Sequence, residues 1–294
     1  MKKLVVLMSM LFFFVASAYA QFTFTNVECP GSTITTARGI NNNGEMVGSY
    51  STGAGRHAAL LKNGQCTFLA PTTVLGTNYS DAFKNNDAGD VVGVFRDNAG
   101  TAHGFFLSKK GVLTQLDFPG AGDTTAWGIN ESGTVVGYFD VYDSQGNSIA
   151  AHGFTWKGGK FTQVDYPGAV DTFLAGINAS GDMVGAWDAG PTATVGHGFV
   201  LSKKGQFINF DVPVSGATNT QLGDINANDQ IVGAYIDAGG NEHGFLQVGA
   251  TFTPFDYPGA VITAAWGINS RGQIVGDYFP NDNVVYGFLA VASK

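Results

Sequence analysis

The sequence predicts an all-β fold, and more specifically a six-bladed β-propeller of four-stranded antiparallel blades. Three observations lead to this prediction. The chain of 294 residues contains 42 glycines and 23 phenylalanines, a composition that favours short strands and tight turns over helices. One sequence signature recurs six times, and the strand that the last repeat lacks is present at the start of the chain.

The repeated signature reads Gly-Ile-Asn, two variable residues, Gly, two further residues and Val-Gly. Clear copies begin at residues 39, 128, 176 and 267, and degenerate copies, which open Lys-Asn-Asn and Asp-Ile-Asn, begin at residues 84 and 224. Neighbouring copies therefore start 43 to 48 residues apart. Because a four-stranded propeller blade takes roughly 40–50 residues, this period predicts six blades.

Each repeat is expected to hold four short strands. The first ends at the signature, where the Asn-x-x-Gly segment makes a turn because both residues tolerate a positive φ. The second is an apolar segment such as 135–139, and the third begins at a His-Gly-Phe tripeptide such as 152–154. The fourth ends at a Pro-Gly pair such as 119–120, since proline cannot donate a hydrogen bond to a strand ladder.

The two ends of the chain complement each other. Residues 22–31 read as a fourth strand without the first three, and the last repeat ends at 286–294 with a third strand and no fourth. We therefore expect residues 22–27 to complete the sixth blade and close the ring, which removes free sheet edges. An open solenoid of the same repeats is the alternative, but it leaves this complementarity unexplained. Residues 21–294 are expected to form one domain.

The first 20 residues have the pattern of a secretory signal peptide. Lys2 and Lys3 form a charged start, residues 4–15 are apolar, and residues 18–20 (Ala-Tyr-Ala) provide a cleavage site. No later segment reaches the roughly 18 consecutive apolar residues that a membrane helix needs. We expect an exported, monomeric protein, extracellular or periplasmic, without a membrane span.

The charge balance and the missing motifs exclude several functions. Without Lys2 and Lys3 the chain carries 13 basic and 23 acidic residues, and such a surface repels a nucleic-acid backbone. The sequence has no G-x-S-x-G elbow, no H-E-x-x-H motif and no phosphate-binding loop. We therefore expect no nucleic-acid partner and no cofactor, and we assign no catalytic residue.

The signature and the His-Gly-Phe tripeptide together resemble a known family. The pattern is similar to the bacterial extracellular repeats of the HAF repeat family, and it covers essentially all of the chain after the leader. The first repeat, with His-Ala-Ala at 57–59, and the last, with Tyr-Gly-Phe at 286–288, depart from the tripeptide. The resemblance implies secretion and a β-propeller-like repeat fold. It implies no activity, because no catalytic motif defines the family.

Four of the five histidines open a His-Gly-Phe tripeptide, and the predicted hairpins place an acidic residue on each side of them. The expected sets are Asp97, His103 and Asp117; Asp140, His152 and Asp165; Asp188, His197 and Asp211; and Asp237, His243 and Asp256. Two carboxylates and an imidazole could ligate a metal. They could equally form a hydrogen-bonded clamp within a blade. Because the set recurs in four blades, we expect the structural clamp and no metal.

Candidate binding residues lie on the face that carries the loops before the first strand and between the second and third strands, which we call the top face. Variable loops on a rigid scaffold commonly bind ligands. Asp140 and Asp143 could be calcium-type ligands, although their loop lacks the spacing of an EF-hand and fits a solvated loop better. Trp127 and Trp266 precede the signature near the centre, where they could stack on sugars or pack against neighbouring blades.

The two cysteines are expected to be free and buried. Cys66 occupies the start of a fourth strand and Cys29 the end of another. If neighbouring fourth strands run in parallel, the two sulfurs lie roughly 15–20 Å apart. That separation exceeds the Cα–Cα limit of about 7 Å for a disulfide.

These observations favour a secreted, non-catalytic repeat propeller that binds a glycan or a protein through its top-face loops. The alternative is an extracellular carbohydrate-active enzyme, a hydrolase or lyase, that uses acidic residues at the channel mouth. Such a pair of acids needs no sequence motif. A purely structural role in an envelope or matrix is the third hypothesis.

Overall fold

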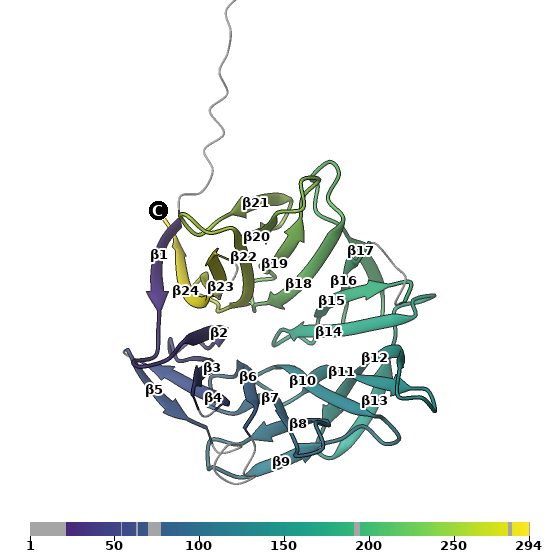
Figure 1. The fold of residues 1–294 in the computed structure, drawn as a ribbon. Helices are drawn as coiled ribbons and strands as arrows, with labels where there is room; N and C mark the ends of the chain where they lie inside the picture. The colour runs from purple at the N-terminus through teal and green to yellow at the C-terminus, as the bar shows by residue number, and fades with distance from the viewer. Residues whose placement is uncertain are drawn as a thin grey trace, which may run out of the picture.

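The computed structural model describes residues 22–53, 55–62, 64–69, 78–190, 195–281 and 284–293. Within these ranges the protein is all-β, as predicted, and four-stranded sheets are arranged around a common centre (Figure 1). The described residues include no helix long and apolar enough to cross a membrane. The expected signal peptide, residues 1–20, lies outside them.

Within each set of four the strands pair antiparallel with their neighbours and, except for β1, follow chain order. One parallel pair, Glu242 with Ile262, joins the last two sets into an eight-stranded sheet, and we number them separately. We number the sheets in chain order. They are sheet 1, β2 (Ile34–Ile40), β3 (Met46–Thr52), β4 (Gly55–Lys62) and β5 (Gln65–Phe68); sheet 2, β6 (Ser80–Asn85), β7 (Val91–Arg96), β8 (Ala102–Leu107) and β9 (Leu113–Leu116); sheet 3, β10 (Asp123–Ile129), β11 (Val135–Tyr142), β12 (Ser148–Lys157) and β13 (Lys160–Val164); sheet 4, β14 (Asp171–Ile177), β15 (Met183–Asp188), β16 (His197–Leu201) and β17 (Phe207–Phe210); sheet 5, β18 (Asn219–Ile225), β19 (Ile231–Ile236), β20 (Glu242–Val248) and β21 (Thr251–Phe255); and sheet 6, β22 (Ile262–Ile268), β23 (Gln273–Asn281), β24 (Val284–Ala292) and β1 (Phe22–Val27).

The first strand of the chain belongs to the last sheet. β1 pairs antiparallel with β24, from Phe22 opposite Ala292 to Val27 opposite Gly287. Beyond β1 the chain crosses to β2, which packs against β23 and β24. The pairing expected for residues 22–27 is therefore present. It places both described ends of the chain on neighbouring strands (Figure 1).

The phenylalanine of the repeated tripeptide anchors sheets 2 to 6. Among the described residues, the largest fully buried side chains are these phenylalanines: Phe105, Phe154, Phe199, Phe245 and Phe288. The glycine of the Val-Gly pair makes room for them. A Cβ on Gly137, for example, would lie 2.0 Å from the carbonyl oxygen of Thr125 and 3.0 Å from the Phe154 ring. Burial of a phenylalanine side chain contributes roughly 1.5–3 kcal/mol, so this position stabilises each of these five sheets strongly.

The prediction of two free thiols is wrong, because Cys29 and Cys66 form a disulfide with a Cα–Cα distance of 5.6 Å. The prediction assumed that both residues stay level with the fourth strands. Cys29 instead follows β1 in the crossing to sheet 1, where it packs in the same cluster as Leu61 and Cys66.

The same crossing occurs between other sheets, with aromatic residues at both positions. Phe118 contacts Phe161, and Tyr166 contacts Phe207, each with ring centroids 5.4 Å apart. In the first sheet the disulfide takes the place of this aromatic contact.

Candidate functional site

A β-bulge precedes the signature in every sheet. The pairing of β10 with β11 passes from Ala126 to Gly128 and skips Trp127, and the pairing of β22 with β23 skips Trp266 in the same way. A bulge redirects the side chain of the extra residue. The residues at this position in sheets 1 to 6 are Arg38, Phe83, Trp127, Ala175, Gly223 and Trp266.

A cavity of about 210 Å³ is lined by residues of the first and second strands of sheets 3 to 6. The aromatic side chains in its wall are Trp127, Tyr138, Phe173 and Trp266, and the remaining lining residues are Leu174, Ala175, Ala186, Gln221 and Leu222. Sheets 3 and 6 place tryptophan at the bulge, whereas sheet 4 places alanine there. This difference in size leaves the space. The structure thus brings Trp127 and Trp266, both predicted site residues, into one cavity, while Asp140 and Asp143 do not line it.

Each of the two tryptophans packs against a side chain of a neighbouring sheet. Phe83 stacks on Trp127 with ring centroids 4.2 Å apart and planes 11° apart. The Arg38 guanidinium carbon lies 4.9 Å from the centroid of Trp266, and Arg38 Nη2 in turn lies 2.9 Å from Oδ2 of the buried Asp277. The two indoles meet edge to face at 6.3 Å. Side chains fixed in this way lose little entropy when a ligand binds.

Two polar groups of the wall have no protein partner. Within the described residues, the Gln221 side chain makes no hydrogen bond, and the Trp266 Nε1–H group is buried without an acceptor. An unsatisfied buried donor costs roughly 1–3 kcal/mol. Because the Trp266 N–H is itself inaccessible, the Gln221 amide is the unpaired polar group that the wall offers to a ligand. The lining residues carry no carboxylate, imidazole or amine. The cavity can therefore bind a molecule with apolar faces and hydroxyl groups, but its wall offers no strong acid or base.

An ion pair that lines the neighbouring polar cavity contacts the backbone of the wall residue Trp266. Lys84 Nζ lies 2.9 Å from Asp224 Oδ2 and also donates a hydrogen bond to the carbonyl oxygen of Trp266. The two residues replace the first glycine of the signature in the two degenerate repeats, in sheets 2 and 5. Burial lowers the pKa of Lys84, and the charge of Asp224 opposes that effect. The degenerate repeats are thus complementary to each other.

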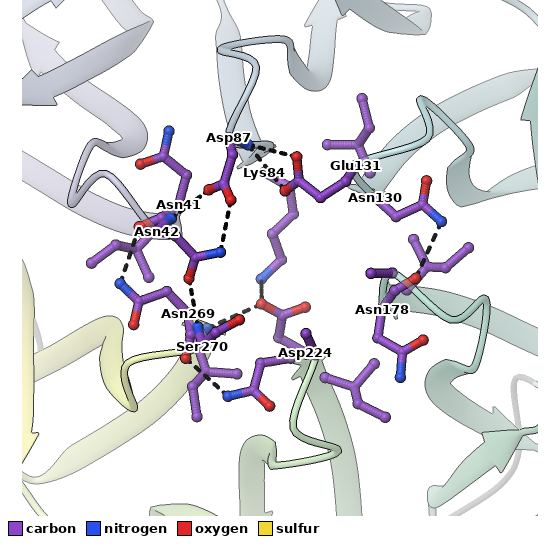
Figure 2. A pocket seen from close by; sticks show the side chains of 18 of the residues that line it. Asn41, Asn42, Lys84, Asp87, Asn130, Glu131, Asn178, Asp224, Asn269 and Ser270 are labelled. Carbon is purple, nitrogen blue, oxygen red and sulfur yellow. Dashed lines mark hydrogen bonds and ion pairs between the residues drawn. The ribbon is translucent and has the colours of Figure 1, made fainter.

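The polar cavity, of about 80 Å³, is lined by both residues of this ion pair (Figure 2). The asparagines of the signature surround it. Each Oδ1 accepts N–H groups of its own turn, as Asn130 does from Ser132 at 3.1 Å and Thr134 at 3.0 Å. Most of the Nδ2 groups donate to the backbone carbonyl of the next repeat's asparagine. These bonds run from Asn41 to Asn86 (3.1 Å), Asn86 to Asn130 (3.4 Å), Asn130 to Asn178 (3.2 Å), Asn226 to Asn269 (2.9 Å) and Asn269 to Asn41 (3.0 Å).

We call this series of hydrogen bonds between the signature asparagines the asparagine circuit. It differs at Asn178. Asn178 Nδ2 donates to Oδ1 of Asp229 at 2.9 Å. Asp229 occupies the place of the turn glycine, which follows the two variable residues of the signature, and has a φ of 57°. The role of these asparagines was not predicted from the sequence. Their recurrence in all six signatures was the signal that could have revealed it.

Each repeated histidine contacts the acid of the fourth strand. The Nδ1–carboxylate distances are 2.7 Å from His103 to Asp117, 3.1 Å from His152 to Asp165, 2.9 Å from His197 to Asp211 and 2.8 Å from His243 to Asp256. Within the part of the chain that the structure describes, a second acid contacts Nε2 in two sheets, namely Asp97 at 3.4 Å and Asp237 at 3.3 Å.

The expectation that Asp140 and Asp188 flank the other two histidines is wrong. Each lies one residue beyond the position opposite the histidine, which is occupied by an aromatic residue, and pairs instead with an acid of the first strand. Asp140 lies opposite Asp123. The hairpin of sheet 3 is longer, and the acid of its turn is Asp143, which accepts N–H groups of Gln145 and Asn147 at 2.9 Å each.

The residue opposite each histidine was also missed. Aromatic rings lie against the imidazoles, with centroid distances of 5.1 Å for Phe95 and His103, 5.3 Å for Phe139 and His152, 4.6 Å for Trp187 and His197, and 5.3 Å for Tyr235 and His243. The described residues contain no group of three or more histidine, cysteine or acidic side chains placed to hold a metal ion.

Asp140 is the carboxyl group whose environment stands out on the top face. Burial, followed by the charges of Asp123 and Asp171, raises the pKa of Asp140 to about 6. A carboxylic acid in this range can hold a proton near neutral pH.

Comparison with known proteins defines the fold class. No protein-family model and no curated protein matches the sequence. The β-propeller domain of the Trilobed protease from Pyrococcus furiosus superposes with a TM-score of 0.55 at 8% identity, over 88% of this chain and 81% of that chain. A streptogramin B lyase gives 0.52 at 13% identity over 93% and 99%. A lectin of Aleuria aurantia in complex with α-methyl-L-fucoside gives 0.55 at 12% identity over 90% and 93%.

The chain is therefore a β-propeller. The similar structures include a lyase and a lectin, so the fold by itself is compatible with either catalysis or binding. The choice between them depends on the site.

Proposed function

We propose that this protein is an exported, closed six-bladed propeller that binds a neutral glycan in the aromatic cavity of its top face. The observation that carries the proposal is the cavity wall, in which Trp127 and Trp266 are fixed by packing beside the unpaired Gln221 amide. Sugar rings present apolar faces that stack on aromatic side chains, and their hydroxyls match a small number of polar groups.

The proposed ring closure is supported by contacts between the first and last repeats. The hydrogen bond from Asn269 to the carbonyl of Asn41 completes the asparagine circuit, and β1 completes sheet 6 by pairing with β24. A closed ring leaves no unpaired first or last sheet.

Export is supported by the leader pattern of residues 1–20 and by the disulfide between Cys29 and Cys66. Disulfides persist mainly in oxidising, extracytoplasmic environments. We propose on the same basis, with the repeated signature and tripeptide, that the chain belongs to the HAF repeat family.

A panel of neutral oligosaccharides tests the function. A ligand that binds only the folded protein raises the melting temperature, and calorimetry then gives its Kd. The Trp127→Ala variant should lose about 2 kcal/mol of binding energy, roughly a 30-fold increase in Kd. The matched control is Trp156→Ala, since Trp156 packs against Phe106 on the outer strands and lines no part of the cavity.

Two results would contradict the proposal. One is equal binding by both tryptophan variants, which would place the ligand elsewhere. The other is turnover of a panel glycan that Asp140→Asn abolishes. That result would support the second candidate function, a carbohydrate-active enzyme, which the raised pKa of Asp140 favours.

A further inference from the structure

We propose that the aromatic cavity recognises the end of a glycan chain, with one terminal sugar ring inserted, rather than an internal segment. This inference rests on the proposed function and specifies its ligand. Three features carry it: a closed floor, a wall that surrounds the ligand, and a neutral lining.

We infer a closed floor, because the innermost strands of adjacent sheets pack closely and one ion pair spans the centre between sheets 2 and 5. A Cβ on Gly128 would lie 2.7 Å from the carbonyl oxygen of Ala175, and one on Gly267 would lie 2.7 Å from that of Arg38. The ion pair of Lys84 and Asp224 fills the remaining space at the centre. The top cavity and the polar cavity share no lining residue. A chain that enters the top cavity therefore has no exit through the ring.

The wall comes from four sheets. Trp127 and Tyr138 belong to sheet 3, Phe173 to sheet 4, Gln221 to sheet 5 and Trp266 to sheet 6. The edge-to-face contact of the two indoles joins the first and last members of this series on the side of sheets 1 and 2. A glycan bound along its length needs a groove that is open at two ends, whereas this wall surrounds a pocket that is open at one end.

The lining selects an uncharged sugar. The charges on Lys84 and Arg38, which both contact Trp266, are each paired with an aspartate, Asp224 and Asp277 respectively. The free Gln221 amide can donate to and accept from hydroxyl groups. An acidic sugar would bury a carboxylate without a counter-charge, which is strongly unfavourable. The ligand class is therefore a neutral terminal pyranose or furanose.

The test uses gluco-, manno-, xylo- and galacto-oligosaccharides of two to eight units and the methyl glycosides of the same sugars. For the series that binds, end recognition predicts a Kd per mole of chain that changes less than about 2-fold from three to eight units, and competition by the methyl glycoside. A Kd that falls in proportion to chain length, without competition by the monomer, would overturn end recognition while leaving glycan binding intact. No binding by any member would overturn the proposed function as well.

A pair of glutamine variants links this behaviour to the cavity. Gln221→Leu keeps the volume of the side chain and removes its polar atoms, so the Kd should rise roughly 3- to 10-fold for the methyl glycoside and the oligomers alike. Gln163→Leu is the matched control, because Gln163 lies on the outer β13 strand and donates to Asp165. An effect of Gln221→Leu on long oligomers only would contradict a terminal ring in the cavity.

Discussion

The residue before each signature lies on the same β-bulge in every sheet, yet its side chain changes from sheet to sheet. The backbone has the same bulge at this position in every sheet, whereas the side chains differ and determine the shape of the cavity. Trp127 and Trp266 form the wall, and Ala175 leaves the space that they enclose. The repeated residues, in contrast, hold the sheets together.

Replacing Ala175 with leucine should fill the cavity and raise the Kd for the best panel glycan at least 10-fold. The fold should tolerate the change, because the added methyl groups enter an existing space. Calorimetry measures the affinity, and thermal unfolding checks the fold. The exposed Ala99→Leu variant is the control. Unchanged affinity in folded Ala175→Leu protein would place the binding site outside the cavity.

The clamp of His103 should stabilise the protein more at low pH than at high pH. Burial disfavours the charged imidazole, but hydrogen bonds and charges from Asp117 and Asp97 outweigh it and raise the pKa of His103. A group whose folded-state pKa is raised contributes its full stability below its unfolded pKa of about 6.5, and that contribution is lost as the pH rises through the folded-state value.

The measurement is thermal or urea unfolding of wild-type and His103→Ala proteins at pH 5.5 and pH 8.5. The variant should lose more stability at pH 5.5, by less than about 1 kcal/mol, since the pair is partly exposed. Thr114→Ala, an exposed and uncharged change on the neighbouring strand, reports effects unrelated to the clamp. A loss that is equal at the two pH values would refute a charged clamp.

At the scale of strands and turns, period and pairing could be predicted from the sequence because they depend on local patterns. The Pro-Gly ends, the tripeptide and the incomplete last repeat located the strands and the partner of β1. Finer register could not be predicted. A shift of one residue puts Phe139 rather than Asp140 opposite His152, and hairpin length alone does not fix that choice.

The contacts made where the chain crosses from one sheet to the next could not be predicted from the sequence either. Cys29 and Cys66 belong to elements of different sheets, and only the path of the chain between them brings the sulfurs together. The cavity was predictable in part. Trp127 and Trp266 were identified by position, but Gln221 and Tyr138 reach the same space only through the arrangement of four sheets.

The disulfide should stabilise the junction between sheets 6 and 1. It joins residues 37 positions apart, and Cys29→Ser should lower the free energy of unfolding by roughly 2–4 kcal/mol. The double variant Cys29→Phe/Cys66→Phe recreates the aromatic contact of Phe118 with Phe161 and should recover part of this loss. Urea unfolding measures both. Thiol titration that finds two free cysteines in the native protein would contradict the bond.

At the scale of the whole molecule, the two degenerate repeats connect distant parts of the ring. Lys84 and Asp224 lie in sheets 2 and 5, and their ion pair lies among the asparagines that line the polar cavity (Figure 2). The glycines at the same position in the other repeats let the inner strands approach closely. The glycines therefore let the inner strands pack closely, and Lys84 and Asp224, which replace this glycine in two repeats, fill the space at the centre.

Breaking this pair on one side should be costly. Lys84→Met leaves the carboxylate of Asp224 without its partner, and we expect a loss of about 3–5 kcal/mol in unfolding free energy. The double variant Lys84→Met/Asp224→Asn removes both charges and should recover at least half of the loss. Urea unfolding of the three proteins measures the coupling. Additive losses in the double variant would show that the two residues do not stabilise each other.

The most direct test of the central claim, glycan binding in the aromatic cavity, is a crystal structure of the protein with the tightest-binding neutral oligosaccharide of the panel. We predict electron density for one terminal sugar ring between Trp127 and Trp266, within hydrogen-bond distance of Gln221, with the rest of the chain leading out of the top face. A sugar bound on the outer strands, or on the face of the asparagine circuit, would contradict the account.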